Sequence, residues 1–142
     1  AGTFSANKIK ELLTDEEKSN FNTFLIYKLK NNVVGYCIAY ENKNILHYSY
    51  PFYDRATDIS NLGLGMMLRA ILHAQESGKK YIYLGSAQRP TDTYKLQFNG
   101  LEWFDSQNWE TDLKTLGKIL TTEQKIKSET KIEEIKIKKK TF

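Results

Sequence analysis

Apolar residues along this chain first alternate with polar ones and later recur at helical spacing. Three β-rich runs, TFLIYKLK, VVGYCIAYE and ILHYSYPFY, are separated by Asn31-Asn32 and by Asn42-Lys43-Asn44. Short, Asn-rich separators suit tight hairpins, so the pattern predicts an antiparallel meander. Alternation in the third run predicts two opposite faces. One face would hold Leu46, Tyr48, Tyr50 and Phe52, and the other Ile45, His47, Ser49 and Pro51.

The periodicity changes after residue 60. A glycine-bearing turn at residues 60–65 leads into an amphipathic helix that Ser60 or Asn61 would cap and Gly78 would end. The segment YIYLG then predicts a strand parallel to the third run, because a helical crossover joins the two. The apolar side of the helix is expected to include Leu64, Met67 or Leu68, Ile71 and Leu72.

The flanking segments complete the predicted fold. Residues 5–20 suggest one or two helical turns, with Thr14 and Glu17 as a capping box. After the YIYLG strand we expect a short helix at DTYKLQF, a strand at LEWFD and a helix from residue 111 to about residue 127. The class is α/β (α+β), with a mixed sheet and helices on both faces. Residues 1–124 are expected to form one domain, and residues 125–142 a basic tail or a terminal strand.

Charge and composition argue against several classes of function and site. The net charge of +4 resides in residues 125–142, where seven lysines face three glutamates, so the rest of the chain is neutral and predicts no basic nucleic-acid-binding face. The single cysteine, Cys37, excludes an internal disulfide and a cysteine zinc site, and the two histidines give no metal-ligand spacing. We expect a cytoplasmic protein without a membrane span, because no apolar run approaches the ~20 residues needed.

The glycine turn is the first candidate site. Its main-chain amides, from Leu62, Gly63, Leu64, Gly65 and Met66, would cradle a phosphate, with Gly63 at positive φ and Gly65 admitting a ligand. The alternative is a tight loop-to-helix junction in which the glycines serve only packing. Asp54 and Asp58 count against anion binding unless their carboxylates point away.

Tyrosines form the second candidate site. Tyrosines on two adjacent strands would flank a cleft, although an aromatic core is the alternative for most of them. The group consists of Tyr48, Tyr50, Tyr53, Tyr81, Tyr83 and Tyr94. Tyr94 and Lys95 follow the YIYLGSAQRP segment, and Arg89 lies where it can contact a phosphate or carboxylate. A solvated loop is the competing interpretation there.

The order of meander, glycine turn, long helix, parallel strand, short helix and strand resembles the GNAT acyltransferase superfamily. That superfamily binds coenzyme A pyrophosphate at a Gln/Arg-x-x-Gly-x-Gly/Ala turn, and here Ser60 stands in the Gln/Arg position while Gly63 and Gly65 match. The chain resembles more closely the C-terminal domain of arginyl-tRNA–protein transferases, over roughly residues 33–100. The matching elements are Tyr53-Asp54, Leu62-Gly63-Leu64-Gly65, Tyr83-Leu84-Gly85 and Tyr94-Lys95 with Phe98.

The resemblance implies an aminoacyl- or acyltransferase that moves its group from aminoacyl-tRNA or acyl-coenzyme A to an amine or a protein N-terminus. Strands ending near Tyr50 and Gly85 would separate and hold the donor, and the glycine turn would hold its phosphate. The residues expected to act on the proton or the substrate are Asp54, Tyr94, Lys95, Tyr50, Tyr83, Gly85, Ser86 and Arg89. The alternative is a degenerate GNAT-like domain that binds a partner or peptide without catalysis.

Overall fold

The computed structural model describes residues 5–15, 17 and 19–122. Contacts within the chain group it into two compact units, Ala1–Gly85 and Ser86–Phe142, each of which is described by itself. The mixed α/β class is confirmed. The single domain over residues 1–124 stays a prediction, and the basic tail at 125–142 lies outside the described residues.

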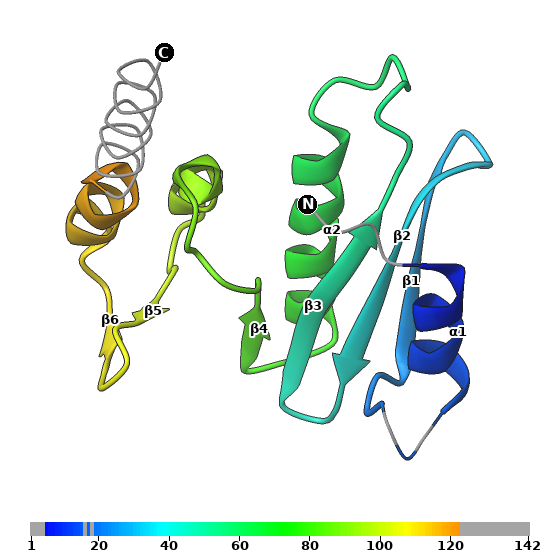
Figure 1. Ribbon diagram of the computed structural model, residues 1–142, viewed down its shortest axis with the longest axis horizontal. Coiled ribbons are helices and arrows are strands. Elements are labelled where there is room, and N and C mark those ends of the chain that lie inside the picture. The colour runs from blue at the N-terminus through cyan, green and yellow to red at the C-terminus, as the bar shows by residue number, and fades with distance from the viewer. Residues whose placement is uncertain (1–4, 16, 18, 123–142) are drawn as a thin grey trace, which may run out of the picture. The chain divides into compact units, whose positions relative to one another are not determined.

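The first unit is built on a four-stranded sheet. Its strands are β1 (Thr23–Leu29), β2 (Asn32–Glu41), β3 (Ile45–Phe52) and β4 (Tyr81–Tyr83), and they lie side by side in that order (Figure 1). β1, β2 and β3 pair antiparallel, whereas β4 pairs parallel to β3. The predicted meander and parallel crossover strand are therefore confirmed.

Asparagines form the tight connections between these strands. Lys30 and Asn31 adopt positive φ values of 48° and 68°, as a two-residue hairpin requires. In the next hairpin the Asn42 side-chain oxygen accepts hydrogen bonds from the backbone N–H groups of Asn44 and Ile45, at 2.9 and 3.0 Å.

A β-bulge in β3 changes which side chains share a face. Ala39 pairs with Tyr48 and Ile38 with Tyr50, so Ser49 is an extra residue between the two pairs. The Tyr50 ring contacts Phe21, which also contacts His47. The predicted grouping of Tyr50 with Tyr48 is wrong, because the extra residue shifts the alternation beyond it.

Helix α2 (Leu62–Glu76) connects β3 to β4 and packs on one face of the sheet. Asn61 caps its start in a left-handed conformation, with φ of 56° and no hydrogen bond from its side chain. The predicted end at Gly78 is confirmed, since this residue has φ of 67° and the following Lys79 N–H reaches the Ala74 carbonyl at 2.9 Å.

The buried side of α2 differs from the predicted one. Its buried residues are Met66, Met67, Ala70 and Ala74, so Met67 is the one fully buried member of the predicted side. Leu64, Ile71 and Leu72 are half-buried, and Leu68 is 46% exposed. The two alanines carry small side chains that allow the helix backbone to lie close to the sheet. A Cβ atom placed on Gly35 of β2 would lie 2.6 Å from the Met66 sulfur, which shows how close this contact is.

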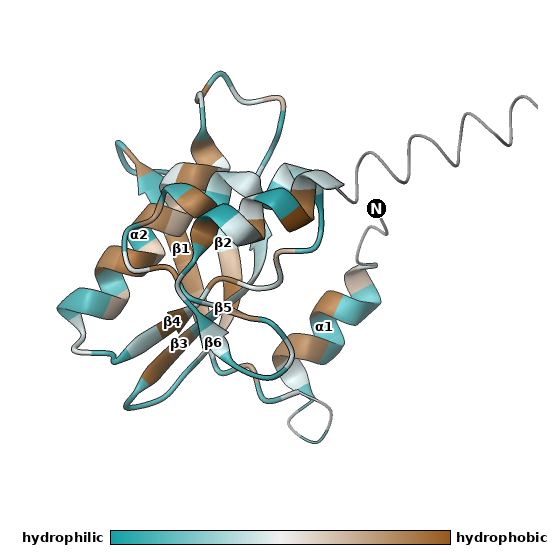
Figure 2. Ribbon diagram, turned by 90° about the vertical axis from the view of Figure 1, so that its left-hand side faces the viewer, coloured by the Kyte–Doolittle hydropathy of each residue, from teal (hydrophilic) through white to brown (hydrophobic). Residues whose placement is uncertain are grey.

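Helix α1 (Ala6–Thr14) lies on the side of the sheet opposite α2, so helices cover both faces (Figures 1 and 2). The Ser5 hydroxyl caps its start by accepting the Lys8 N–H at 3.2 Å. The Thr14 hydroxyl donates to the Lys10 carbonyl at the helix end. Thr14 therefore ends a helix rather than beginning one, and the predicted capping box is wrong.

The second unit combines short elements. The 3₁₀ helix η1 (Pro90–Gln97) is followed by the hairpin strands β5 (Trp103–Phe104) and β6 (Trp109–Glu110). A helix begins at residue 113 and is described to residue 122, and it buries Leu116 and Leu120. The remainder of the predicted helix, to about residue 127, lies outside the described residues. Over the residues that the structure covers, no helix is long and apolar enough to cross a membrane.

Candidate functional site

The strands β3 and β4 stay together for only three residue pairs, which end at His47 and Tyr83. Beyond this point β3 continues to Phe52, whereas β4 ends and the chain turns at Gly85, with φ of 77°. A turn of this kind favours glycine because a Cβ atom is strained at positive φ. The end of pairing between two parallel strands is a common place for a ligand to bind in α/β proteins.

The bulge lies on the part of β3 beyond this pairing. The Ser49 hydroxyl is buried, and no hydrogen-bond partner for it lies among the described residues. Burial raises the pKa of the neighbouring Cys37 thiol to about 12, and the backbone N–H groups of Ser49 and Tyr50 offset part of this effect. Cys37 is therefore a protonated core residue and no nucleophile at neutral pH.

An aromatic cluster surrounds His47 at the last β3–β4 pair. Its ring lies 6.4 Å from that of Phe21 and 6.2 Å from that of Tyr83, and Phe21 contacts Tyr50 edge-to-face at 5.3 Å. The predicted Tyr50 and Tyr83 thus come together through Phe21 and His47. Burial lowers the pKa of His47, so its imidazole is neutral at pH 7 and can accept a proton.

The glycine turn is the first turn of α2. Gly63 is helical rather than at positive φ, and a Cβ atom there would lie 2.6 Å from the Tyr53 hydroxyl. The expected positive φ at Gly63 is therefore wrong, and its lack of a side chain serves packing. At Gly65 a Cβ atom would meet nothing within 4 Å, which leaves open space beside the helix.

Only some amides of this turn can point outward. The Gly65 N–H donates to the Asn61 carbonyl at 2.9 Å, so it is already used within the helix. The N–H groups of the first three helical residues have no partner within the helix itself. These belong to Leu62, Gly63 and Leu64. The side chain of Met66 is buried beneath the turn. An anion at this turn would be held by the first three amides, and that role stays a prediction.

The Asp54 carboxylate is exposed in the loop before α2. One of its oxygens accepts the Ala56 N–H at 2.8 Å, and the Asp54 carbonyl accepts the Thr57 N–H at 3.4 Å. These bonds form the turn that leads toward α2. The structure thus gives Asp54 a structural role, and its proton-transfer role stays a prediction.

The second unit brings three other predicted residues together. The buried Lys95 ammonium donates to the Ser86 carbonyl at 2.7 Å and lies 5.9 Å from the centre of the Tyr94 ring. Burial lowers the pKa of Lys95, while the Asp92 carboxylate opposes that change. Lys95 and Ser86 therefore fix the conformation of the segment that precedes η1.

Asp92 is a buried carboxylate at the start of η1 that the sequence pattern did not reveal. Its buried carboxylate accepts the backbone N–H groups of Gln88 and Arg89, at 3.1 and 2.9 Å, and pairs with the Arg89 guanidinium at 3.0 Å. Burial raises the pKa of Asp92, but these hydrogen bonds outweigh it and lower the pKa overall. An acidic residue two positions after Pro90 is a helix-start signal that would have identified it.

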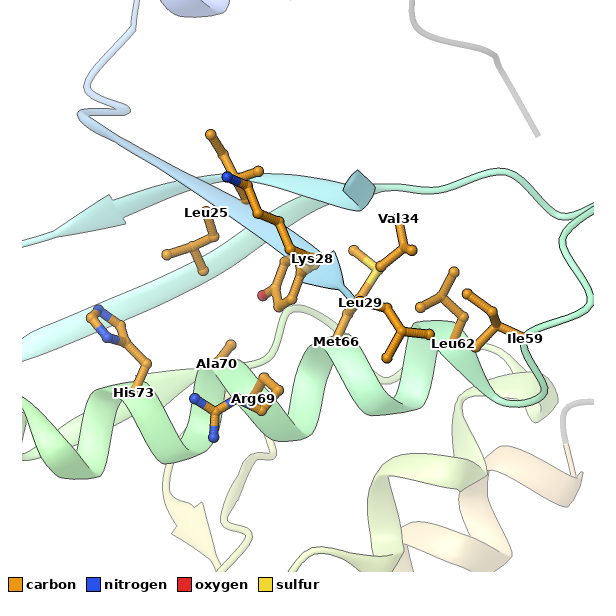
Figure 3. Close-up of a pocket in the computed structure, with 12 residues that line it drawn as sticks. Leu25, Lys28, Leu29, Val34, Ile59, Leu62, Met66, Arg69, Ala70 and His73 are labelled. Carbon is orange, nitrogen blue, oxygen red and sulfur yellow. The ribbon is translucent and has the colours of Figure 1, made fainter. Parts of the chain in front are cut away.

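A cavity of about 480 Å³ lies in the first unit, between β1 and α2 (Figure 3). Leu62 and Met66, two residues of the predicted glycine turn, contribute to its lining. The rest is mostly apolar, with Lys28 of β1 and Arg69 of α2 as cationic lining residues. The glycine turn predicted to bind the donor therefore borders this cavity, which the sequence did not indicate.

Comparison with known proteins identifies relatives. Residues 4–105 match the family model described as "Arginine-tRNA-protein transferase, C terminus". An aspartate/glutamate leucyltransferase of Dinoroseobacter shibae is 33% identical over 81 residues, which cover 56% of this chain and 28% of that protein. Another, from Saccharophagus degradans, is 29% identical over 84 residues, which cover 58% of this chain and 36% of that protein.

The chain therefore matches only about a third of the length of these curated relatives. No solved structure matches it. The family match contains the whole four-stranded sheet, the bulge at Ser49, α2 and η1.

Proposed function

This chain belongs to the family described as the arginine-tRNA-protein transferase C terminus, and from this membership we propose that it transfers an aminoacyl group from an aminoacyl-tRNA to a protein N-terminus. The names of the two relatives favour leucine as the transferred residue and N-terminal aspartate or glutamate as the acceptor. The family match over residues 4–105 carries this proposal. Neither comparison favours the alternative of a domain without catalysis.

An aminoacyl ester is already reactive toward an amine, so the protein mainly has to position the two substrates. The α-amino group of the acceptor attacks the carbonyl carbon of the aminoacyl ester and forms an amide bond. The bond between that carbon and the terminal ribose oxygen of the tRNA breaks, and the tRNA leaves with a hydroxyl group. The attacking amine loses one proton and the leaving oxygen gains one, so the step balances. A group that accepts the proton and a site that orients both substrates are what the protein supplies.

We place the aminoacyl ester where β3 and β4 separate. Backbone groups of β3 next to the bulge would orient its carbonyl, and the aromatic cluster would supply apolar walls. His47 would accept the proton, because it is the neutral imidazole within this cluster. This role extends the predicted set of Asp54, Tyr94 and Lys95, whose roles in proton transfer stay predictions.

Coenzyme A is the less favoured donor. Ser60 stands where the coenzyme A motif has Gln or Arg, and Gly63 packs against Tyr53 rather than opening the turn. An aminoacyl-tRNA presents a charged backbone and needs no pyrophosphate cradle of that kind. The expected donor is therefore leucyl-tRNA or arginyl-tRNA.

A transfer assay tests the proposal. The protein is incubated with radiolabelled leucyl-tRNA or arginyl-tRNA and with peptides that differ only in an N-terminal Asp, Glu or Ala. Label is expected in the Asp and Glu peptides and not in the Ala peptide. Incorporation from neither tRNA, under conditions in which the chain is folded by circular dichroism, would reject the transferase function. Transfer from acetyl-coenzyme A instead would reject the tRNA donor.

A glycine variant tests where the donor binds. Gly65→Ala fills open space beside α2 and raises helix propensity, so it is expected to stabilise the chain by about 0.5–1 kcal/mol. If the donor approaches this turn, the same variant lowers transfer while unfolding at higher urea. Unchanged transfer would place the donor elsewhere. Glu76→Ala, at the other end of α2, is the matched control.

A further inference from the structure

The outer edge of β1 is open. β1 is the terminal strand of the sheet, and in the described part of the chain no strand pairs with its other side. Its sequence, TFLIYKL, is strongly apolar, and Phe24, Ile26 and Leu29 are 45–53% exposed. Proteins usually cover or charge such an edge, because its N–H and C=O groups readily pair with another strand.

A groove runs beside this edge. It is the 480 Å³ cavity described above, whose walls are β1 and the side of α2 that carries Leu62, Arg69 and His73 (Figure 3). A strand added to β1 would lie over this side of α2, and every second side chain would point into the groove. The apolar lining suits an aliphatic side chain at some of those positions, and the cationic groups of Lys28 and Arg69 suit an acidic one at the others.

The polar groups of the groove indicate the charge of the occupant. Lys28 and Arg69 line it and have no ion-pair partner among the residues that the structure covers. Among the described residues no carboxylate lines the groove, and the His73 imidazole lies 3.7 Å from the Glu41 carboxylate. A second copy of the chain would bring the same cations face to face, whereas an acidic partner would neutralise them.

The Tyr27 hydroxyl supplies one further group. It is buried in the groove wall and has no hydrogen-bond partner in the described residues. A buried hydroxyl without a partner is costly in the free protein and is satisfied when an acceptor arrives. A carboxylate or carbonyl of an added segment is such an acceptor.

We propose that an extended polypeptide segment, whose groove-facing side chains include both apolar and acidic residues, adds as a fifth strand to the edge of β1 and fills the β1–α2 groove. Main-chain pairing gives this segment affinity, and Lys28 and Arg69 select its acidic side chains. The interaction is independent of the proposed transfer reaction, so the loss of one does not imply the loss of the other.

Peptide binding tests the proposal. The probes are a fluorescein-labelled peptide of Val-Thr-Glu-Thr repeats, which places Val and Glu on one face of a strand, and its counterpart with Lys in place of Glu, measured by fluorescence anisotropy. The Glu peptide is expected to bind and to slow amide hydrogen exchange in residues 23–29. Binding of neither peptide, or binding of the Glu peptide without protection of β1, overturns the proposal. Protection of β1 that grows with protein concentration and without peptide overturns it in favour of a second copy.

Charge reversal provides the control. Lys28→Glu with Arg69→Glu is expected to weaken binding of the Glu peptide at least about tenfold and to create binding of the Lys peptide. Binding of the Lys peptide by the double variant also shows that this variant is folded. Lys43→Glu, an exposed lysine in the β2–β3 turn, is expected to leave both affinities unchanged. An unchanged preference in the double variant, or an equal loss with Lys43→Glu, overturns the role of the groove.

The Tyr27→Phe variant measures the contribution of the Tyr27 hydroxyl to peptide binding. It removes one hydrogen-bond donor and little volume, so the Glu peptide is expected to bind about threefold more weakly. Tighter binding by this variant would contradict the contact and would place the segment away from the groove wall.

Discussion

At the residue scale, His47 is suited to accept a proton both by its place at the end of the β3–β4 pairing and by its neutral charge state. It belongs to the last pair that joins β3 to β4, and the rings of Phe21 and Tyr83 lie 6.4 and 6.2 Å from its ring. Burial disfavours the imidazolium form and lowers the pKa of His47 below its ordinary 6.5. A lowered pKa keeps the base competent at a more acidic pH than an exposed histidine would allow.

His47→Gln tests this role through the pH dependence of transfer. Protonation removes the base, so the wild-type rate is expected to fall as the pH drops through the lowered pKa of His47. The variant should lose about 10²-fold in rate and should keep only the fall caused by protonation of the acceptor α-amino group, whose own pKa is about 7.7–8.0. The measurement is the single-turnover transfer rate between pH 5 and 8. A variant that also keeps the fall at the lowered pKa of His47 would assign that fall to another group.

At the element scale, the contact between α2 and β2 depends on Gly35. A Cβ atom there would lie 2.6 and 2.9 Å from the terminal atoms of Met66 and 3.1 Å from the Phe52 carbonyl oxygen. The helix can approach the sheet this closely because Gly35 has no side chain and because Ala70 and Ala74 have small ones. This approach sets the position of the first turn of α2.

Gly35→Ala is therefore expected to destabilise the chain by about 1–3 kcal/mol, because the new methyl group displaces Met66. In a Met66→Ala background the same change should cost clearly less, since the crowded atoms are gone. Urea denaturation of the four proteins measures the difference. An equal cost in both backgrounds would show that the Phe52 carbonyl, rather than Met66, limits the space.

Elements show why part of the fold was predictable and part was not. The Asn-rich hairpins and the helix end at Gly78 could be predicted from the sequence, because their local backbone conformations favour Asn and Gly. The bulge at Ser49 does not, because it exists only relative to the partner strand β2. The buried side of α2 was predicted only in part, at Met67, because that helix is apolar on more than one side and only the sheet selects which side is covered.

At the scale of the whole molecule, the candidate residues fall into two sets. Tyr50, Tyr83 and Gly85 lie in the first unit, whereas Ser86, Arg89, Tyr94 and Lys95 lie in the second. One domain was predicted because the sequence contains no segment with the composition of a linker. Two compact units can still follow each other directly along the chain, as they do between Gly85 and Ser86. The first unit contains the whole four-stranded sheet and α2.

A fragment of residues 1–85 tests this division. It is expected to unfold cooperatively in urea and to give dispersed amide resonances, because its sheet and its covering helices are complete. A fragment that ends at residue 78 lacks β4 and serves as the control, with an expected loss of stability. If residues 1–85 show no cooperative transition, the single domain predicted over residues 1–124 is the better description.

The extra residue in β3 also has a genetic consequence. Deleting a residue of this strand away from the bulge reverses the facing of the side chains on one side of the deletion. Deleting Ser49 leaves Tyr48 opposite Ala39 and Tyr50 opposite Ile38, so both halves keep their orientation. Loss of that one codon would thus remove the distortion of the backbone and spare the aromatic cluster. A three-nucleotide deletion can separate what the main chain contributes at this site from what the side chains contribute.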